Sequence, residues 1–104
     1  MDEYKVKITE EAESQIEGYL EYLLLKFKSE QAYNAVKDDY YHTLERLSRV
    51  AGAQKIADDP RLASLKIRKI FFEKHDYVML YRLNGDVAEI LKIFHALEDY
   101  TNKI

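Results

Sequence analysis

The sequence lacks cysteine altogether and contains only one proline and three glycines among its 104 residues. The absence of cysteine excludes a disulfide framework and a thiolate metal site. Long apolar runs are also missing: residues 22–25 (YLLL) form one of the longest, far short of the roughly 20 residues that a membrane-spanning helix needs. The first residues are charged and no apolar core follows them, so we expect no signal peptide. These absences favour a cytoplasmic protein without a membrane span.

The composition that remains is typical of one folded domain. Hydrophobic residues make up 47% of the sequence and charged residues 34%, which is too apolar for a disordered chain. A chain of this length buries about 60–65% of its unfolded surface without help from disulfides or metals. We therefore expect a single domain over residues 1–104.

The formal net charge of −3 conceals an uneven distribution of charge along the chain. Residues 1–30 contain four basic and eight acidic residues, a net charge of −4, whereas residues 61–82 contain six basic and two acidic residues, a net charge of +4. A sequence pI near 5.6 argues against a general nucleic-acid binder, because the domains of such proteins are usually basic. Any anion-facing surface must therefore come mainly from Arg61, Lys66, Arg68, Lys69, Lys74 and Arg82.

The first half of the chain predicts a strand followed by two helices. Residues 4–8 alternate between apolar and polar with a period of two, as a half-buried strand does. Thr9 and Ser29 each supply a hydroxyl group where a helix can begin. Apolar residues recur at steps of three and four over residues 10–28 and again between Ser29 and Gly52, which is placed to end the second helix. Because the connection at Ser29 is very short, the two helices should run antiparallel.

The second half predicts an antiparallel meander of strands. Residues 65–72 have strand character, and residues 77–95 contain two runs rich in β-branched, aromatic and aliphatic residues on either side of the dipeptide Asn-Gly at 84–85. Asn-Gly between such runs is the strongest short-range signal for a β-hairpin. With these two residues as the loop, Leu83 faces Asp86 on the opposite strand.

Strict alternation along this hairpin divides its side chains between two faces. One face carries Tyr77 and Phe94, and the other carries Val78, Ile93 and His95. Both faces are largely apolar. We therefore expect the hairpin to lie centrally in a sheet, with a layer covering each side.

The predicted element order is β-α-α-β-β-β. Between the second helix and the second strand the periodic pattern lapses, and Pro60 breaks any helix there. This order indicates an α+β fold in which an antiparallel helical hairpin packs on a small, mainly antiparallel four-stranded sheet.

Three short stretches also carry family features in a consistent order along the chain. They are residues 4–6 (YKV) with Thr9 and Ala12, residues 76–81 (DYVMLY), and residues 93–100 (IFHALEDY). Together they resemble the RelE/ParE superfamily, the toxin halves of bacterial toxin–antitoxin pairs, which often shows G/D-Y-R-x-x-Y in the third strand and H-x-x-R-D-Y at the end. The resemblance spans nearly the whole chain and implies the fold predicted above.

Two positions depart from the mRNA-cleaving branch of that superfamily. Val78 stands after Tyr77, where the ribosome-dependent nucleases usually carry arginine, and Glu98 stands before Asp99, where arginine is common. In such nucleases the cations hold the scissile phosphate, and the loss of one preorganised donor raises the barrier by about 3–4 kcal/mol. The resemblance therefore implies a ParE-like toxin, and it leaves open whether the protein is an enzyme.

His95 and Tyr100 are the catalytic candidates. His95 ends a predicted strand and can exchange a proton near neutral pH. A C-terminal tyrosine such as Tyr100 does hydroxyl chemistry in some nuclease members of the superfamily. Packing is the alternative role for both, because no nucleophile accompanies His95 in the sequence. No two histidines have the spacing of metal ligands, so we expect neither a metal nor a cofactor.

Two groups of residues are candidates for binding a partner. Basic residues suited to gripping the target, through phosphate or an acidic surface, are Lys66, Arg68, Lys69 and Lys74. Their alternative role is that of solvated edge-strand charges that deter aggregation. Tyrosines are enriched at protein interfaces, and those suited to contacting an antitoxin cluster on the helical hairpin at Tyr19, Tyr22, Tyr33, Tyr40 and Tyr41. Half-buried packing is their alternative.

Three functional hypotheses follow from the resemblance and the departures from it. The favoured one is the toxin of a type II toxin–antitoxin module that binds an essential target, as ParE relatives do with DNA gyrase, and that a cognate antitoxin neutralises. The second is a ribosome-dependent mRNA endonuclease that uses the basic residues at 66–69 with His95 or Tyr100. The third is a non-toxic domain that only binds its antitoxin. A homodimer is left open.

The acidic N-terminal region adds one expectation about the antitoxin. Residues Glu13, Glu17 and Glu21 recur at steps of four, so they share one face of the first predicted helix. We expect the antitoxin segment that meets them to carry lysine or arginine, and the attraction to weaken with salt.

Overall fold

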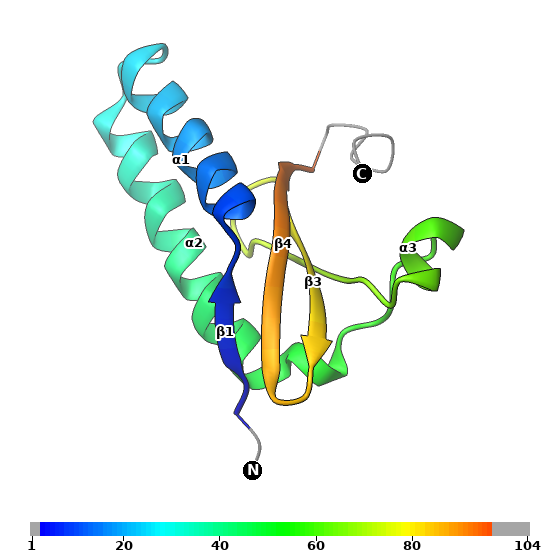
Figure 1. Cartoon of the computed structure of the whole chain (residues 1–104). Helices are drawn as coiled ribbons and strands as arrows, with labels where there is room; N and C mark the ends of the chain where they lie inside the picture. Colours follow the sequence, from blue (N-terminus) through cyan, green and yellow to red (C-terminus); the bar gives the residue numbers. More distant parts are fainter. Residues whose placement is uncertain (1–2, 97–104) are drawn as a thin grey trace.

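The computed structural model describes residues 3–96 (Figure 1). Its elements, in chain order, are β1 (Lys5–Ile8), α1 (Glu10–Leu25), α2 (Glu30–Val50), the 3₁₀ turn η1 (Ala51–Ala53), α3 (Pro60–Ser64), β2 (Arg68–Phe71), β3 (Tyr77–Asn84) and β4 (Val87–His95). The predicted order of one strand, two helices and three strands is confirmed, with η1 and α3 added. Within the described part of the chain no helix is both long and apolar enough to cross a membrane.

The four strands form one sheet in the order β1-β4-β3-β2. Strands β2, β3 and β4 make the predicted antiparallel meander, and β1 adds to β4 in parallel. The sheet is therefore mixed and mainly antiparallel. Strands β1 and β2 are the two edges of the sheet, and the chain passes from one to the other through the helical hairpin α1–α2, η1 and α3.

Both helices begin at the hydroxyl residues that the sequence indicated. The side-chain oxygen of Thr9 accepts a hydrogen bond from the amide of Ala12 at 3.2 Å, and that of Ser29 accepts from the amide of Ala32 at 3.1 Å. Each cap satisfies an amide that has no partner within the first helical turn. Helix α1 ends at Leu25, three residues before the predicted end, because the chain turns sharply through Lys28 at φ +52°.

Gly52 has a different role from the predicted one. Helix α2 ends at Val50, and Gly52 lies inside η1 without the positive φ of a helix-ending glycine. A Cβ atom at Gly52 would lie 2.2 Å from the phenol oxygen of Tyr4. Gly52 lies where the start of the chain packs against the end of α2, and this close approach leaves no room for a side chain.

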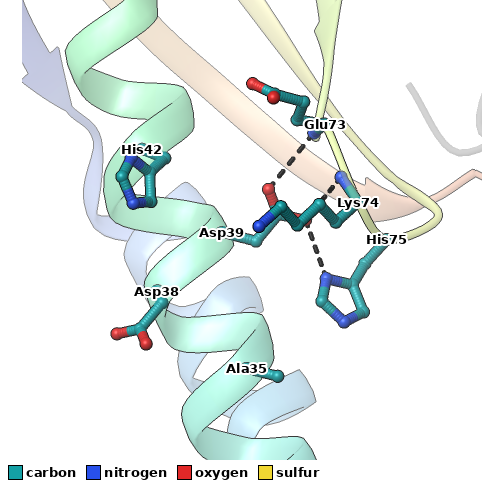
Figure 2. A pocket seen from close by; sticks show the side chains of 7 residues that line it. All are labelled: Ala35, Asp38, Asp39, His42, Glu73, Lys74 and His75. Carbon is teal, nitrogen blue, oxygen red and sulfur yellow. Dashed lines mark hydrogen bonds and ion pairs between the residues drawn. The ribbon is translucent and has the colours of Figure 1, made fainter.

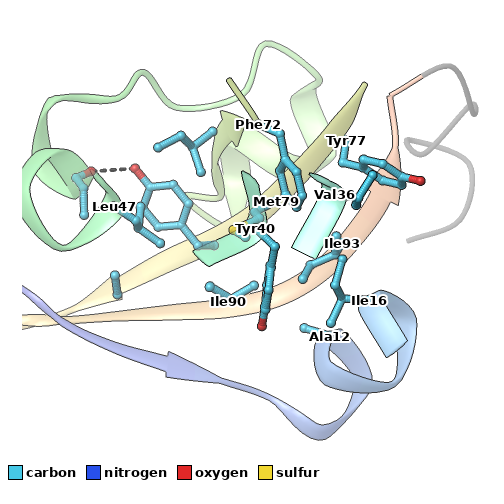
Figure 3. Close-up of a cluster of buried hydrophobic side chains, with 14 residues drawn as sticks. Ala12, Ile16, Val36, Tyr40, Leu47, Phe72, Tyr77, Met79, Ile90 and Ile93 are labelled. Atoms are coloured by element: carbon cyan, nitrogen blue, oxygen red, sulfur yellow. Dashed lines mark hydrogen bonds between the residues drawn. The ribbon is translucent and has the colours of Figure 1, made fainter. Parts of the chain in front are cut away.

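The main core lies between the helical hairpin and one face of the sheet (Figure 3). Its fully buried members come from every layer, and they include Ala12 and Ile16 of α1, Val36 and Leu47 of α2, and Met79, Tyr81, Ile90 and Ile93 of the sheet. A second, smaller cluster covers the opposite face where α3 and its flanking segments fold over β3, and it contains Ala57, Leu62, Ile67, Val78, Leu80 and Phe94. The prediction that both faces of the hairpin are covered is confirmed.

The turn between β3 and β4 differs from the predicted one by one residue. Asn84 pairs with Val87, so the two loop residues are Gly85 and Asp86 rather than Asn84 and Gly85. Only Gly85 has a positive φ, of +64°. A type I′ turn needs positive φ at both loop positions, whereas a type II′ turn needs it only at the first, where glycine is preferred. The glycine therefore takes the first loop position.

A β-bulge alters the faces of β4 beyond the turn. The register shifts between Leu80 and Tyr81, so Tyr81 pairs with Ile90 while Leu80 pairs with Lys92. One extra residue on β4 reverses the alternation that follows it. Ile93 consequently joins the main core, and Phe94 joins the second cluster, each on the face opposite to the one predicted.

The segment before β2 forms a short helix that the sequence did not predict. The side chain of Asp59 accepts hydrogen bonds from the amides of Arg61 and Leu62, and Pro60 occupies the first turn of α3. Proline is favoured there because its missing amide proton has no helical partner in any case. Strand β2 then begins at Arg68, later than predicted, since the chain turns at Lys66 with φ +59°.

Two buried tyrosines are expected to ionise late. Burial raises the pKa of Tyr40 and of Tyr81 to about 12 each, from an ordinary value of 10.0, and repulsion from Tyr41 adds to the effect at Tyr40. The folded state favours the neutral phenols, so their contribution to stability is complete below pH 10.0 and is lost as the pH rises through about 12. Tyrosinate absorbance should include two groups that titrate near pH 12, of which Tyr81→Phe removes one. Tyr22→Phe, at an exposed position, should leave both.

Candidate functional site

An aromatic hollow lies where the end of α1 meets the adjoining ends of β3 and β4. Its volume is about 340 Å³, and its lining residues are Tyr19, Tyr22, Leu23, Phe27, Tyr77 and His95. Four come from α1 and the turn after it, and two come from the sheet. Because Tyr77 pairs with His95 across β3 and β4, the sheet places these two rings side by side against the helix.

The rings of this aromatic hollow are held in place by one another. The ring of Tyr19 lies 5.1 Å from that of Tyr77, and the ring of Tyr22 meets that of Phe27 edge to face at 5.2 Å. Burial raises the pKa of Tyr77, which keeps its phenol neutral. Tyr22 and Phe27 nevertheless remain 52% and 64% exposed. Large aromatic side chains that stay this exposed around a hollow are typical of a surface that receives apolar groups of a partner.

His95 lies in the wall of the aromatic hollow and contacts aromatic residues. Its ring meets that of Tyr77 edge to face at 5.1 Å, and its backbone amide donates a hydrogen bond to the phenol oxygen of Tyr19 at 3.1 Å. These contacts fit a residue that shapes a binding surface. Tyr100, the other catalytic candidate, lies outside the described residues.

The five tyrosines proposed to contact an antitoxin occupy different environments. Tyr19 and Tyr22 line the aromatic hollow. Tyr33 is half-buried on α2, with the ammonium group of Lys37 5.5 Å from the centre of its ring. Tyr40 is only 7% exposed and packs in the main core. Tyr41, the next residue, is exposed, so the tyrosines do not form one continuous surface.

The four basic residues proposed to contact a target are also divided. Arg68 faces the helices, where its guanidinium group donates a hydrogen bond to the carbonyl oxygen of Gln54. Lys69, its neighbour on β2, points to the opposite face, as alternation along a strand requires. Lys66 is exposed in the turn before β2, and Lys74 is exposed in the loop after it. They do not all lie together on one face of the sheet.

The residues suggested for RNA cleavage are also separated along the strands. Arg68 pairs with Tyr81 on β3, whereas His95 pairs with Tyr77, four residues along that strand. At the rise of a β-strand this separation is about 13 Å. A general acid or base must lie within hydrogen-bond reach of the reacting group that the cations hold. This arrangement therefore does not bring His95 and the basic residues of β2 to a common point.

The position that carries arginine in the nuclease branch is buried here. Val78 has no exposed surface and packs in the second cluster against Leu80 and Phe94. A charged side chain at this place would have to enter an apolar layer beneath α3. The other departing position, Glu98, lies outside the described residues.

A second hollow, of about 370 Å³, surrounds the carboxylate of Asp39 (Figure 2). Asp39 is 3% exposed, and it accepts hydrogen bonds from the amides of Glu73 at 3.2 Å and Lys74 at 3.0 Å. The Nδ1 atom of His75 lies 2.7 Å from the same carboxylate and must donate to it. These hydrogen bonds hold the β2–β3 loop against α2, so the role of Asp39 is structural.

Sequence reasoning did not identify Asp39 or Phe27. Asp39 lies three residues after Val36 and four before Thr43, on the buried stripe of α2, and a carboxylate at such a position is a signal for a buried hydrogen-bonded anchor. Phe27 continues the apolar periodicity of residues 10–28, and its exposure follows from the early end of α1 at Leu25. No group of three or more potential metal-ligating residues occurs within residues 3–96.

Comparisons with known proteins agree with this fold. A family model described as the ParE toxin of the type II toxin–antitoxin system parDE matches residues 6–100. A solved chain of the chromosomal ParDE toxin–antitoxin system from P. aeruginosa superposes with a TM-score of 0.70 at 20% sequence identity, over 88% of this chain and 95% of that chain. No curated protein matches significantly. Because the family match spans nearly the whole sequence, the chain belongs to the ParE toxin family of type II toxin–antitoxin systems.

Proposed function

We propose that the protein is a cytoplasmic toxin that arrests growth by binding an essential protein target of the DNA gyrase type, and that a cognate antitoxin neutralises it. The observation that carries this proposal is the match of residues 6–100 to the ParE toxin family. The similar solved chain belongs to a chromosomal ParDE toxin–antitoxin system from P. aeruginosa, which supports an antitoxin as the partner here.

The geometry supports binding over RNA cleavage. The basic residues of β2 are divided between two faces, His95 lies about 13 Å further along the strands, and Val78 replaces a phosphate-gripping arginine inside an apolar cluster. Phosphoryl transfer depends on cations already positioned around the reacting phosphate. Nuclease activity therefore stays the second hypothesis.

The deciding experiment compares the two activities directly. Expression of the protein alone should slow growth, and the purified protein should trap gyrase–DNA cleavage complexes. It should leave mRNA on translating ribosomes uncut in a toeprinting assay. Cleavage at the ribosomal A site would reject binding as the mechanism. Absence of growth arrest together with tight antitoxin binding would favour a non-toxic, antitoxin-binding domain.

We further propose that the antitoxin covers the aromatic hollow. The ring of Tyr22, on the rim of the hollow, also lies beside the exposed side chain of Leu25, so an apolar strip continues from the hollow onto the tip of the helical hairpin. An amphipathic helix or an extended segment can place apolar anchors along such a strip. The acidic residues of α1 lie on an adjoining exposed surface, where they suit a basic flank of the same segment.

Replacing Phe27 with alanine is expected to weaken antitoxin binding by roughly tenfold to a hundredfold, because exposed aromatic anchors dominate many interfaces. Phe71→Ala provides a matched control, since Phe71 is also exposed but lies on β2, away from the hollow. Calorimetric titration of each purified variant with the antitoxin measures the difference. Equal affinities for the two variants would remove the hollow from the antitoxin interface.

The charge of the antitoxin segment has its own test. Reversal of Glu13, Glu17 and Glu21 to lysine should weaken binding, and the loss should shrink as the salt concentration rises. All three residues are exposed, so the changes should leave the fold intact. Indifference of the affinity to these reversals would reject a basic partner segment.

A further inference from the structure

The face of the sheet opposite the helical hairpin carries a second surface, which the basic run at residues 61–82 does not by itself reveal. In β1, Val6 and Ile8 pack against the main core. Alternation along the strand therefore directs Lys5 and Lys7 to the opposite face. Both lysines are exposed, and neither forms an ion pair with another residue in the range that the structure describes.

The strand register extends this basic surface across the sheet. Lys7 pairs with Glu89 of β4, and Glu89 pairs with Arg82 of β3, so these three side chains form a row. The guanidinium group of Arg82 lies 3.5 Å from the carboxylate of Glu89. Lys7 and Arg82 are two strands apart, or about 10 Å. The negative charge of Glu89 thus neutralises only one of its two neighbouring cations, so the row keeps a net positive charge.

The next row of side chains on the same face, which contains Leu80, adds two further cations beside apolar residues. Lys92 pairs with Leu80 next to the bulge, and its ammonium group lies 2.5 Å from the carboxylate of Glu11. Lys69 pairs with Leu80 from the other side, on the same face. We name the sheet cations Lys5, Lys7, Lys69, Arg82 and Lys92 the basic sheet face. Against its five positive charges stand the two carboxylates of Glu11 and Glu89, which leaves a net charge of +3.

An apolar hollow of about 350 Å³ opens beside the basic sheet face. Its apolar lining residues are Leu65, Ile67, Leu80 and Leu91. The rest of its wall consists of Thr9, Arg82 and the ion pair of Lys92 with Glu11. Leu65 is 51% exposed although it stands next to the second hydrophobic cluster. The hollow can therefore take a branched aliphatic side chain, with cations beside it for flanking carboxylates.

We propose that the basic sheet face is the target-binding surface of this toxin, and that its partner is an acidic protein surface that inserts an aliphatic side chain into the hollow. The hollow favours protein over nucleic acid, because its lining is aliphatic and contains no aromatic side chain on which a base could stack. Positive charge around the hollow complements carboxylates and speeds encounter with an acidic surface.

This inference rests on the proposed function and makes it more specific. The aromatic hollow lies against α1, whereas the basic sheet face lies on the other side of the sheet, the side that α3 partly covers (Figure 1). Their charges also differ, since α1 exposes acidic residues and the sheet exposes basic ones. Substitutions on the basic sheet face should therefore abolish toxicity without releasing the antitoxin.

The test is the double variant Lys7→Glu/Arg82→Glu, with Arg49→Glu/Lys55→Glu as the control of equal charge change. Arg49 at the end of α2 and Lys55 after η1 are exposed and lie outside the face. Growth arrest should be lost in the first variant and kept in the control, and both should bind the antitoxin like the wild type. With purified gyrase as the probe, the first variant should bind about tenfold or more weakly. A second variant, Leu65→Asp, changes an exposed residue of the hollow and should behave like the first.

Each other outcome overturns the inference in a recognisable way. Growth arrest that persists in both Lys7→Glu/Arg82→Glu and Leu65→Asp rejects this face as the target site. Tight binding of the wild type to a short DNA duplex or RNA strand that disappears in the first variant makes the face a nucleic-acid site. Loss of antitoxin binding in both variants, with circular dichroism unchanged, assigns the face to the antitoxin. If the wild type itself does not arrest growth, the proposed function fails first and the inference falls with it.

Discussion

Replacing Asp39 with alanine is expected to lower the free energy of unfolding by about 3–5 kcal/mol, as the loss of one partner from a buried charged group typically does. The carboxylate is 3% exposed and satisfies two loop amides and the imidazole of His75. Without it, the amides of Glu73 and Lys74 lose their partner in a place where water replaces it poorly. A loss of this size is a large fraction of the stability of a domain of about 100 residues.

Asp38→Ala is the matched control, because Asp38 is the preceding residue of the same helix and its side chain is exposed. Its effect should stay within about 0.5 kcal/mol. Urea unfolding followed by circular dichroism measures both variants. The single variant His75→Ala and the double variant Asp39→Ala/His75→Ala complete the cycle that isolates the share of the imidazole. Equal stability of the Asp38 and Asp39 variants would show that the loop does not depend on this anchor.

Replacing Ile93 with alanine is expected to cost about 3 kcal/mol, since it leaves a cavity in the main core. Ile93 has no exposed surface and packs among residues of the helices and the sheet. The residue reaches this core only because the bulge in β4 reverses the alternation after Tyr81 pairs with Ile90. The size of the loss of stability therefore also tests whether the bulge places Ile93 in the main core.

Leu91→Ala gives the comparison for Ile93→Ala. Leu91 lies on the other face, is half-buried and lines the apolar hollow, so its truncation should cost about 1 kcal/mol. Denaturant midpoints with equal slopes for the two variants allow a direct comparison. If Leu91→Ala proved the more damaging of the two, Ile93 would not lie in the main core and the assignment of the faces of β4 would be wrong.

These two stability predictions concern the parts of the fold that hold the proposed binding surfaces. Asp39 fixes the loop that leads into Tyr77, a wall of the aromatic hollow. The bulge at Leu91 determines which side chains of β4 turn toward the basic sheet face. Neither variant touches an exposed residue of either surface, so a partial loss of function in them should follow the loss of stability.

Much of the fold was predictable from local pattern. The alternation at residues 4–8, the caps at Thr9 and Ser29, and the apolar steps along both helices predicted β1, α1 and α2, because each pattern depends on chemistry within a few residues. Short motifs at both ends of the chain pointed to the ParE family, which the match over residues 6–100 confirmed.

The sequence was less informative at positions where one residue is compatible with more than one local structure. Gly85 can occupy either loop position of a two-residue turn, and local propensity favoured the wrong one. The proline after Asp59 ends a helix in one context and starts one in another, and here the carboxylate of Asp59 determined that α3 begins. No local sequence pattern indicates the bulge in β4, because the bulge results from burying apolar side chains on both faces of the sheet at once.

The sequence by itself determined the element order, the helix starts, the family and the kinds of side chain available for binding. Only the tertiary structure decided which of those side chains lie together. Arg68 and Lys69 are adjacent in the chain yet face opposite sides of the sheet, while Lys7 and Arg82 are 75 positions apart and share one row through Glu89. Strand pairing determines which residues become neighbours in the sheet. It depends on burying residues that are distant in the sequence, and no short stretch of sequence specifies that burial.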